Sequence, residues 1–294
     1  MSRLPQASSA FMHCQLFYVR DTQQMQIAHL QALIVAHKLP VVLHVERCTD
    51  KLTQKRRQRL SQTSSQPILL LDDKDTLSWL SDGLSVAPEW DKLQRRVVSA
   101  GRKSELLLQA AKLTAESRAI DATAGFGHDS LILASTGAQV VMLEQQPLMA
   151  LLLLAEQQRM TALPNWQKLM ARLQIINTDA IRYFDSMSRQ SLASADKSID
   201  VVYLDPMFPE DSHQDQKTGK GAKVGKHMQA LHQLARPPTI DEEQQLLQSA
   251  LSAVSQHSGR VIVKRPQLAP LLANQAASES WHNEAVRFDG YFAG

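Results

Sequence analysis

Apolar and polar positions change their spacing near residue 100 of this 294-residue chain. Before that point, short apolar runs such as 41–45 and 68–71 are bounded by polar turns, which favours strands. After it, short apolar runs alternate with stretches whose apolar residues recur every three or four positions, which favours helices. The pattern predicts a small α+β domain over residues 1–92 and a larger α/β domain over residues 93–294.

The larger domain is expected to alternate strands with helices. The expected strands end at or just before Asp121, Glu144, Asp179, Asp205 and Lys264, and the expected helices cover residues 104–115, 130–135, 147–161 and 242–256. Strands separated by helices form a parallel sheet with helices on both faces. Because ligands of such sheets bind beyond the carboxyl ends of the strands, these five residues are the first candidates for a functional site.

Composition narrows the class of protein without naming a function. The chain is 44% hydrophobic and 21% charged, an ordinary balance for a soluble globular protein. Its longest dense apolar run, 148–155, is too short to span a bilayer, and residues 1–12 do not resemble a secretion leader. Cys14 and Cys48 lack the spacing of a metal site. We expect a cytoplasmic protein with reduced cysteines and no bound metal.

The basic residues are more informative than the net charge of +3. They gather in three groups, each of which is either a solvated face or a contact for a polyanion. The groups are Lys51, Lys55, Arg56, Arg57 and Arg59; Arg95, Arg96, Arg102 and Lys103; and Lys217, Lys220, Lys223 and Lys226. The first lies on an expected helix over 51–60, so the small domain is a candidate for RNA docking.

A glycine-rich turn follows the first strand of the larger domain. Gly125 and Gly127 allow a ligand to approach bare backbone, and Glu144 ends the next strand, where a carboxylate can accept hydrogen bonds from ribose hydroxyls. NAD and S-adenosylmethionine both fit this geometry. Ser130 replaces the third glycine of a dinucleotide fingerprint, and Asp121 would repel a pyrophosphate but attract a cationic ligand. The turn therefore favours S-adenosylmethionine, although Asp121 and Asp129 could also serve as simple caps.

The segment 205–209, Asp-Pro-Met-Phe-Pro, is the sharpest motif in the chain. It resembles the [Asn/Asp]-Pro-Pro-aromatic motif of amino-group methyltransferases. Asp205 can accept the N–H bonds of an exocyclic base amine, Pro206 stiffens the turn, and Phe208 offers a stacking face. Asp205 could instead be a turn residue only, and Phe208 could pack onto the core.

Four segments, 121–129, 203–209, 263–266 and 287–289, resemble the bacterial small-subunit ribosomal RNA methyltransferase J family. That family methylates the N2 amine of one guanine in 16S rRNA. The resemblance covers residues 93–294 well and the N-terminal third poorly. It implies a class I S-adenosylmethionine-dependent methyltransferase fold, which is Rossmann-like with a mostly parallel seven-stranded sheet.

The resemblance also implies particular site residues. Carried over by motif, the cofactor contacts are His128, Asp129, Glu144, Gln145, Asp179, Ala180 and Asp205, beside the turn residues Asp121, Gly125 and Gly127. His128 and Gln145 stand where the family has arginines, and Asp179 and Ala180 where it has small hydroxyl residues. The expected RNA contacts are Arg95, Arg96, Arg102, Lys223, Lys226, Lys264 and Arg265.

The sequence thus predicts methyl transfer from S-adenosylmethionine to guanine N2 of 16S rRNA or the small ribosomal subunit. Methylation of adenine N6 or of a protein amide, a non-catalytic RNA-binding protein with a retained cofactor pocket, and an NAD-dependent oxidoreductase stay open as alternatives. The target nucleotide and the oligomeric state do not follow from the sequence.

Overall fold

The structure is a computed structural model, and it describes residues 11–48, 52–191, 199–208 and 236–292. The chain forms two compact units. One comprises Met1–Ala87 and Pro147–Arg159, and the other comprises Pro88–Gln146 and Met160–Gly294. The first unit therefore ends in the chain close to the expected boundary at residue 92, but it also includes most of helix α6 (Pro147–Thr161), which was not expected.

The first unit contains a five-stranded sheet. Its strand order is β2 (Val41–Arg47), β1 (Met12–Tyr18), β3 (Ile68–Leu71), β4 (Leu77–Ser81) and β5 (Leu84–Val86), with helices α1 (Gln24–Ala36) and α2 (Gln54–Thr63) between strands. β1 pairs in parallel with β2 and β3, and the last strands are antiparallel. The α+β architecture matches the expectation for the N-terminal region. Cys14 and Cys48 are buried here.

The second unit contains a mostly parallel sheet of seven strands. The order is β11 (Glu279–His282), β12 (Val286–Phe292), β10 (Arg260–Pro266), β9 (Val201–Leu204), β6 (Arg118–Asp121), β7 (Gln139–Glu144) and β8 (Leu173–Asn177). Strands β6 to β10 are parallel to their neighbours in this group, whereas β12 is antiparallel to β10 and to β11. The expected seven-stranded sheet is therefore confirmed.

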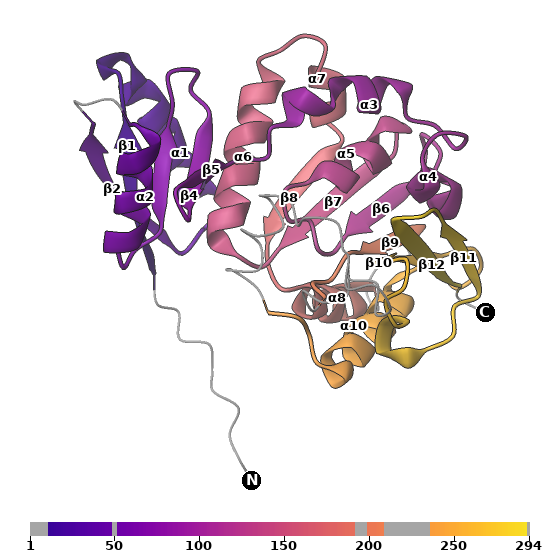
Figure 1. The fold of residues 1–294 in the computed structure, drawn as a ribbon. Coiled ribbons are helices and arrows are strands. Elements are labelled where there is room, and N and C mark those ends of the chain that lie inside the picture. Colours follow the sequence, from indigo (N-terminus) through magenta and orange to yellow (C-terminus); the bar gives the residue numbers. More distant parts are fainter. Residues whose placement is uncertain (1–10, 49–51, 192–198, 209–235, 293–294) are drawn as a thin grey trace. The chain divides into compact units, whose positions relative to one another are not determined.

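Helices cover both faces of this sheet (Figure 1). Figure 1 shows α8 (Ala180–Ser191) and α10 (Ile240–Ala253) on one face, and α3 (Gln94–Ser99), α4 (Leu106–Ala111) and α5 (His128–Ser135) on the other, with α7 (Gln167–Met170) next to α5. Phe184 of α8 and Leu247 of α10 are fully buried in one core cluster with Val202 and Val261 of the sheet. Burial of such apolar faces is the main force that holds helices on a sheet.

Side chains set element ends that apolar spacing alone could not give. The helix expected over 104–115 ends at Ala111, because Lys112 adopts φ 51° and Arg102 donates to the carbonyls of Lys112 and Leu113 at 2.9 and 3.2 Å. The helix expected from residue 242 begins at Ile240, where Thr239 and Glu242 form a capping box. Reading periodicity therefore placed the elements but misplaced several ends by two to four residues.

Candidate functional site

The carboxyl ends of β6, β7, β9 and β10 gather the candidate residues of the second unit. Asp121 is the last residue of β6, Glu144 the last of β7, and Asp205 follows β9 directly, while Lys264 lies in the second half of β10. Neighbouring strands of one parallel sheet end at the same edge. The sheet thus brings together side chains that the sequence separates by up to 143 positions, the interval from Asp121 to Lys264.

The glycine turn between β6 and α5 depends on backbone that only glycine adopts without strain. Gly125 has φ 52° and Gly127 has φ 74°, both in the left-handed region, and Gly127 is the N-cap of α5. The turn is tied from both sides. Gly125 donates its N–H to Glu144 Oε2 at 3.0 Å, and Trp90 donates its indole N–H to the Phe126 carbonyl at 2.8 Å. The expected turn is present and held in one shape.

Asp121 and Glu144 are buried acids beside this turn. Asp121 accepts hydrogen bonds from Ser130 Oγ and from the Thr123 N–H, and Glu144 accepts from the N–H groups of Gly125 and Gln146. Burial nevertheless raises the pKa of each carboxyl to about 7.

Within the described ranges, no lysine or arginine forms an ion pair with either acid. Two buried carboxylates without a cation suit a ligand that is itself positively charged and carries hydroxyl groups.

Lys264 lies between two further acids. Its ammonium donates to Asp129 Oδ2 at 2.8 Å and to Asp205 Oδ2 at 2.9 Å, and these three side chains are called the lysine bridge below. Tyr203 donates its hydroxyl to the same oxygen of Asp129 at 2.7 Å, and the Arg96 guanidinium lies 3.9 Å from Asp129 Oδ1. The bridge connects the start of α5, on the side of the glycine turn, with the Asp-Pro-Met-Phe-Pro motif.

The lysine bridge fixes its own charges. Burial disfavours the Lys264 ammonium, but Asp205 and Asp129 outweigh this and raise the pKa of Lys264 far above its ordinary value. Burial would also raise the pKa of Asp129, yet Lys264, Tyr203 and Arg96 hold it below the ordinary value. For Asp205, burial and the charge of Asp129 prevail over Lys264, so its pKa is raised. Of the two acids of the bridge, Asp205 is the one whose pKa is raised.

The backbone after β9 is held against the glycine turn. Asp205 donates its N–H to Thr123 Oγ1 at 2.6 Å, and Pro206 is buried. Phe208 is only 5% exposed, and the Arg265 guanidinium lies 5.7 Å from the centre of its ring. Phe208 therefore packs inward in this structure, and its stacking on a base stays a prediction that requires one face of the ring to become accessible.

Several expected cofactor contacts have structural partners of their own. His128 is hydrogen-bonded through Nε2 to the Pro88 carbonyl at 2.7 Å, and burial lowers the pKa of this imidazole. Asp179 Oδ1 accepts the Arg182 N–H at 3.0 Å and thus caps α8, whereas Ala180 is buried in the core. Gln145 is exposed beyond the end of β7. Asp129, Glu144 and Asp205 remain the expected residues that converge on the turn.

The expected RNA contacts are divided by the structure. Lys264 is taken up by the lysine bridge. Arg265 is 4% exposed and donates to Glu243 Oε1 at 2.6 Å, while Glu243 Oε2 accepts the Ala273 N–H. These contacts do not support an encounter of either side chain with RNA phosphate, because both cations already face half-buried carboxylates. Lys223 and Lys226 lie outside the described residues.

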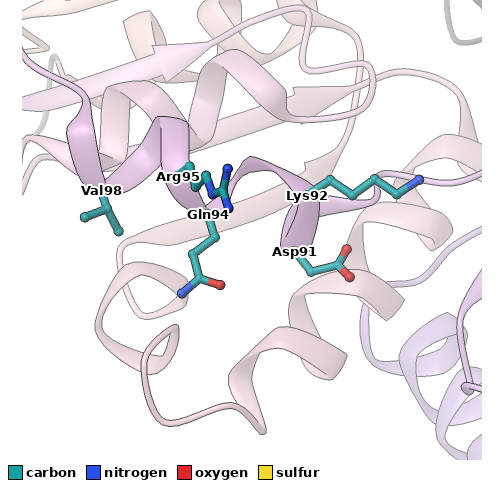
Figure 2. A pocket seen from close by; sticks show the side chains of 5 residues that line it. All are labelled: Asp91, Lys92, Gln94, Arg95 and Val98. Atoms are coloured by element: carbon teal, nitrogen blue, oxygen red, sulfur yellow. The ribbon is translucent and has the colours of Figure 1, made fainter.

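The basic segment at α3 faces two directions. Arg96 binds Glu105 through two hydrogen bonds of 2.8 and 2.9 Å and approaches Asp129, and Arg102 is committed to the end of α4. Arg95 instead lines an open pocket of about 770 Å³, together with Asp91, Lys92, Gln94 and Val98 (Figure 2). Arg95 is exposed and lies next to a hollow in the surface.

Comparison with known proteins settles the family. The family model described as "Putative SAM-dependent methyltransferase" matches residues 46–293. A curated relative from Psychrobacter cryohalolentis, named ribosomal RNA small subunit methyltransferase J, is 74% identical over 99% of this chain and 100% of its own length. The chain belongs to the ribosomal RNA small subunit methyltransferase J family.

More distant members of this family agree. A relative of the same name from Acinetobacter baumannii is 34% identical over 94% of this chain and 93% of its own. The crystal structure of an S-adenosylmethionine-dependent methyltransferase from Neisseria gonorrhoeae superposes with a TM-score of 0.65 at 26% identity, covering 95% of this chain and 96% of that chain. The class I methyltransferase fold and the preference for S-adenosylmethionine over NAD are thereby confirmed.

The site of this methyltransferase J family member fits its cofactor. S-adenosylmethionine carries a sulfonium, an ammonium and a ribose, and the glycine turn, Glu144 and Asp121 offer bare backbone and carboxylates that lack a described cationic partner. Among the described residues, no group of three or more His, Cys, Asp or Glu side chains could hold a metal ion. In the same part of the chain, no helix is long and apolar enough to cross a membrane.

Reading the sequence missed the residues that hold the site together. Thr123 binds the Asp205 backbone, Tyr203 binds Asp129, and Asn177 donates to the carbonyls of Glu144 and Gln145 at 2.8 and 3.2 Å. Each lies at a strand end or in the glycine turn. Their position was a usable signal, although their partners were not visible before the sheet order was known.

Proposed function

We propose that this protein transfers a methyl group from S-adenosylmethionine to the exocyclic N2 amine of a guanine in 16S rRNA. The observation that carries the proposal is the position of Asp205. Its backbone is hydrogen-bonded to Thr123 in the cofactor turn, and its carboxylate is fixed on one oxygen by Lys264. A hydrogen-bond acceptor for an amine therefore stands beside the place where the methyl donor binds.

The rRNA substrate is supported by the relatives, whose printed name refers to the RNA of the small ribosomal subunit. The charge pattern agrees with it, because Lys92 and Arg95 line a surface hollow next to α3. Exposed Lys55 and Arg59 on α2 make the first unit a second candidate docking surface for RNA phosphate. An rRNA substrate in turn supports a cytoplasmic location.

The main contribution of the protein to this reaction is to orient the guanine amine toward the methyl carbon. When bound, S-adenosylmethionine supplies a methyl carbon on a positively charged sulfur. A guanine amine is a weak nucleophile because its lone pair is delocalised into the ring. Asp205 accepts an N–H of that amine and so localises the lone pair and directs it to the methyl carbon. The N–C bond forms as the C–S bond breaks, and the proton leaves the nitrogen to Asp205 or to water.

The test is product analysis. The protein is incubated with tritium-labelled S-adenosylmethionine and rRNA, either naked or in small subunits, from a strain that lacks the gene. Digestion to nucleosides should give labelled N2-methylguanosine. Labelled methyladenosine or labelled protein would refute the guanine assignment, and tight cofactor binding without transfer would support a non-catalytic RNA-binding protein.

A further inference from the structure

Lys264 is the residue whose contacts differ most from its expected role. Two of the three N–H bonds of its ammonium point at Asp129 Oδ2 and Asp205 Oδ2, and its side chain is only 26% exposed. A phosphate that approached this ammonium would also approach two carboxylates. Repulsion by those acids offsets the attraction of the lysine, so Lys264 is poorly suited to bind RNA backbone.

The geometry leaves one oxygen of the Asp205 carboxylate for the substrate. Lys264 donates to Oδ2, and no described residue donates to Oδ1. We propose, building on the proposed function, that Lys264 is a positioning residue for methyl transfer. Its ammonium keeps Asp205 ionised and holds the carboxylate by Oδ2, so that Oδ1 faces the target amine.

The surrounding charges show why Asp205 needs this lysine. The groups that act on it from the packed elements are Lys264 and Arg265 of β10, Asp129 of α5, Asp121 of β6 and Tyr203 of β9, with Arg96 of α3 next to Asp129. Arg265 is committed to Glu243 and Arg96 to Glu105. Lys264 is thus the described cation in direct contact with Asp205. Without it, a buried carboxylate would face Asp129 and would take up a proton.

A protonated Asp205 would be a poor partner for the amine. A neutral carboxyl accepts hydrogen bonds more weakly than a carboxylate, and it cannot accept the proton that the methylated nitrogen releases. Lys264 therefore acts on the reaction through Asp205. The same ammonium also fixes Asp129 at the first turn of α5, so one cation links the cofactor side of the site with the base side.

The test compares the pH dependence of kcat in four proteins with saturating rRNA and S-adenosylmethionine: wild type, Lys264→Met, Lys264→Arg and Asp129→Asn. Lys264→Met keeps a side chain of similar length and removes its positive charge. We expect kcat of Lys264→Met at neutral pH to fall by about 10²-fold or more. The acid limb of its pH profile, along which kcat rises as Asp205 loses its proton, should move to higher pH. Activity should therefore be partly recovered in alkali. Lys264→Arg should keep the limb near that of wild type.

Asp129→Asn gives the opposite sign. It removes the negative charge that opposes ionisation of Asp205 while leaving Lys264 in place, so the acid limb should move to lower pH. Loss of a merely structural contact would not produce opposite shifts in two variants. The inference is wrong if the acid limbs of Lys264→Met and Asp129→Asn both stay at the pH of the wild-type limb. It is also wrong if Lys264→Met raises only the KM for RNA and weakens the salt dependence of that KM.

Two controls separate the possible failures. Circular dichroism shows which variants are folded, and if Lys264→Met is unfolded, Lys264→Gln replaces it as the neutral variant. The NMR chemical shift of the Asp205 carboxyl carbon, measured against pH, reports the change in protonation of Asp205 without turnover. Wild-type protein that labels no rRNA guanine refutes the proposed function, whereas unchanged titration of Asp205 in the neutral Lys264 variant refutes the role of Lys264.

Discussion

We expect Asp205 to act in the chemistry on the base and to contribute little to binding of the cofactor. Its carboxylate touches Lys264, and its backbone rather than its side chain bonds the cofactor turn. We therefore expect Asp205→Ala to lower kcat by about 10²- to 10⁴-fold, the range for removal of a residue that handles the reacting proton. The dissociation constant for S-adenosylmethionine, measured by calorimetry, should change far less.

Asp200 provides a matched control at the other end of β9. It precedes β9 at the opposite edge of the sheet and accepts the Arg118 N–H at 2.8 Å. Asp200→Asn should leave methyl transfer and cofactor affinity close to wild type. Equal losses of transfer and cofactor affinity in Asp205→Ala would instead mean that Asp205 mainly holds the cofactor.

The two buried acids beside the glycine turn, Asp121 and Glu144, are expected to make cofactor binding depend on pH. Burial raises the pKa of Asp121 and Glu144 to about 7, whereas in the unfolded chain such carboxyls titrate near about pH 4. Between these two pH values the folded protein therefore binds protons that the unfolded chain does not bind. The free energy of unfolding of the ligand-free protein should therefore gain a favourable contribution as the pH falls from about 8 to about 5.

Affinity for S-adenosylmethionine should move in the opposite direction over that interval, because the donor is cationic and prefers the ionised acids. Calorimetry near pH 7 in two buffers of different ionisation enthalpy should detect release of protons on binding. Glu144→Gln and Asp121→Asn should each reduce that release. Binding that is independent of pH between 6 and 8 would contradict the assignment of these carboxyls to the cofactor site.

Elements support the site through contacts that are distant in the sequence. Trp90, in the 3₁₀ turn Trp90–Leu93, is fully buried and donates its indole N–H to Phe126 in the glycine turn. Trp90→Phe should keep most of the apolar packing and remove the indole N–H that donates to the Phe126 carbonyl. We expect a loss of about 1–3 kcal/mol in the free energy of unfolding, the usual cost of an unsatisfied buried group.

The same change should weaken S-adenosylmethionine binding, because Phe126 lies between the two glycines of the turn. Chemical denaturation and calorimetry check both effects. Trp166→Phe, at another tryptophan buried in this unit with 3% exposure, is the control for loss of an indole away from the turn. If both variants lose the same cofactor affinity, the Trp90 bond has no special role.

The sequence predicted the elements that carry the site because strand ends and glycine turns have local signatures. Apolar runs gave the strands that end at Asp121 and Glu144, and Gly125 and Gly127 marked the turn between them. What it could not give were contacts set by sheet order. β9 pairs with β6, and β10 pairs with the other side of β9. Lys264 therefore contacts Asp205 and Asp129 instead of solvent.

Aromatic and cationic side chains near the motif illustrate the same limit. The sequence predicts that Phe208 stacks on the base or packs onto the core, and that Arg265 contacts RNA. In the fold, Glu243 of α10 pairs with Arg265, and that guanidinium lies over Phe208. A helix 22 positions earlier in the chain decided the outcome, and nothing in the local sequence encodes that partner.

The whole chain is not divided where a change of composition suggests. Residues Pro147–Arg159 cluster with the N-terminal residues, whereas Pro88 and Trp90 belong to the unit that holds the cofactor turn. A cut at residue 92 would remove the partners of His128 and Phe126. Either fragment of such a cut would thus lack part of its own unit, namely Pro147–Arg159 of the first and 88–92 of the second.

Binding of a large polyanion is the property to which both units should contribute. Lys92 and Arg95 line the pocket beside α3, and Lys55 and Arg59 are exposed on α2. Each lysine or arginine that neutralises a phosphate releases counterions, which steepens the fall of affinity with salt. We expect Lys92→Gln/Arg95→Gln and Lys55→Gln/Arg59→Gln to weaken rRNA binding. Each pair should lower the slope of log affinity against log salt by about 2.

Turnover separates this role from catalysis. Both double variants should raise the KM for rRNA while kcat at saturating rRNA and the affinity for S-adenosylmethionine stay near wild type, because none of the four side chains contacts the lysine bridge. Lys38 and Lys74, exposed on the first unit outside α2, give a control pair as glutamines that should keep the slope. If only the α3 pair lowers the slope, RNA bypasses α2, and the first unit serves stability rather than docking.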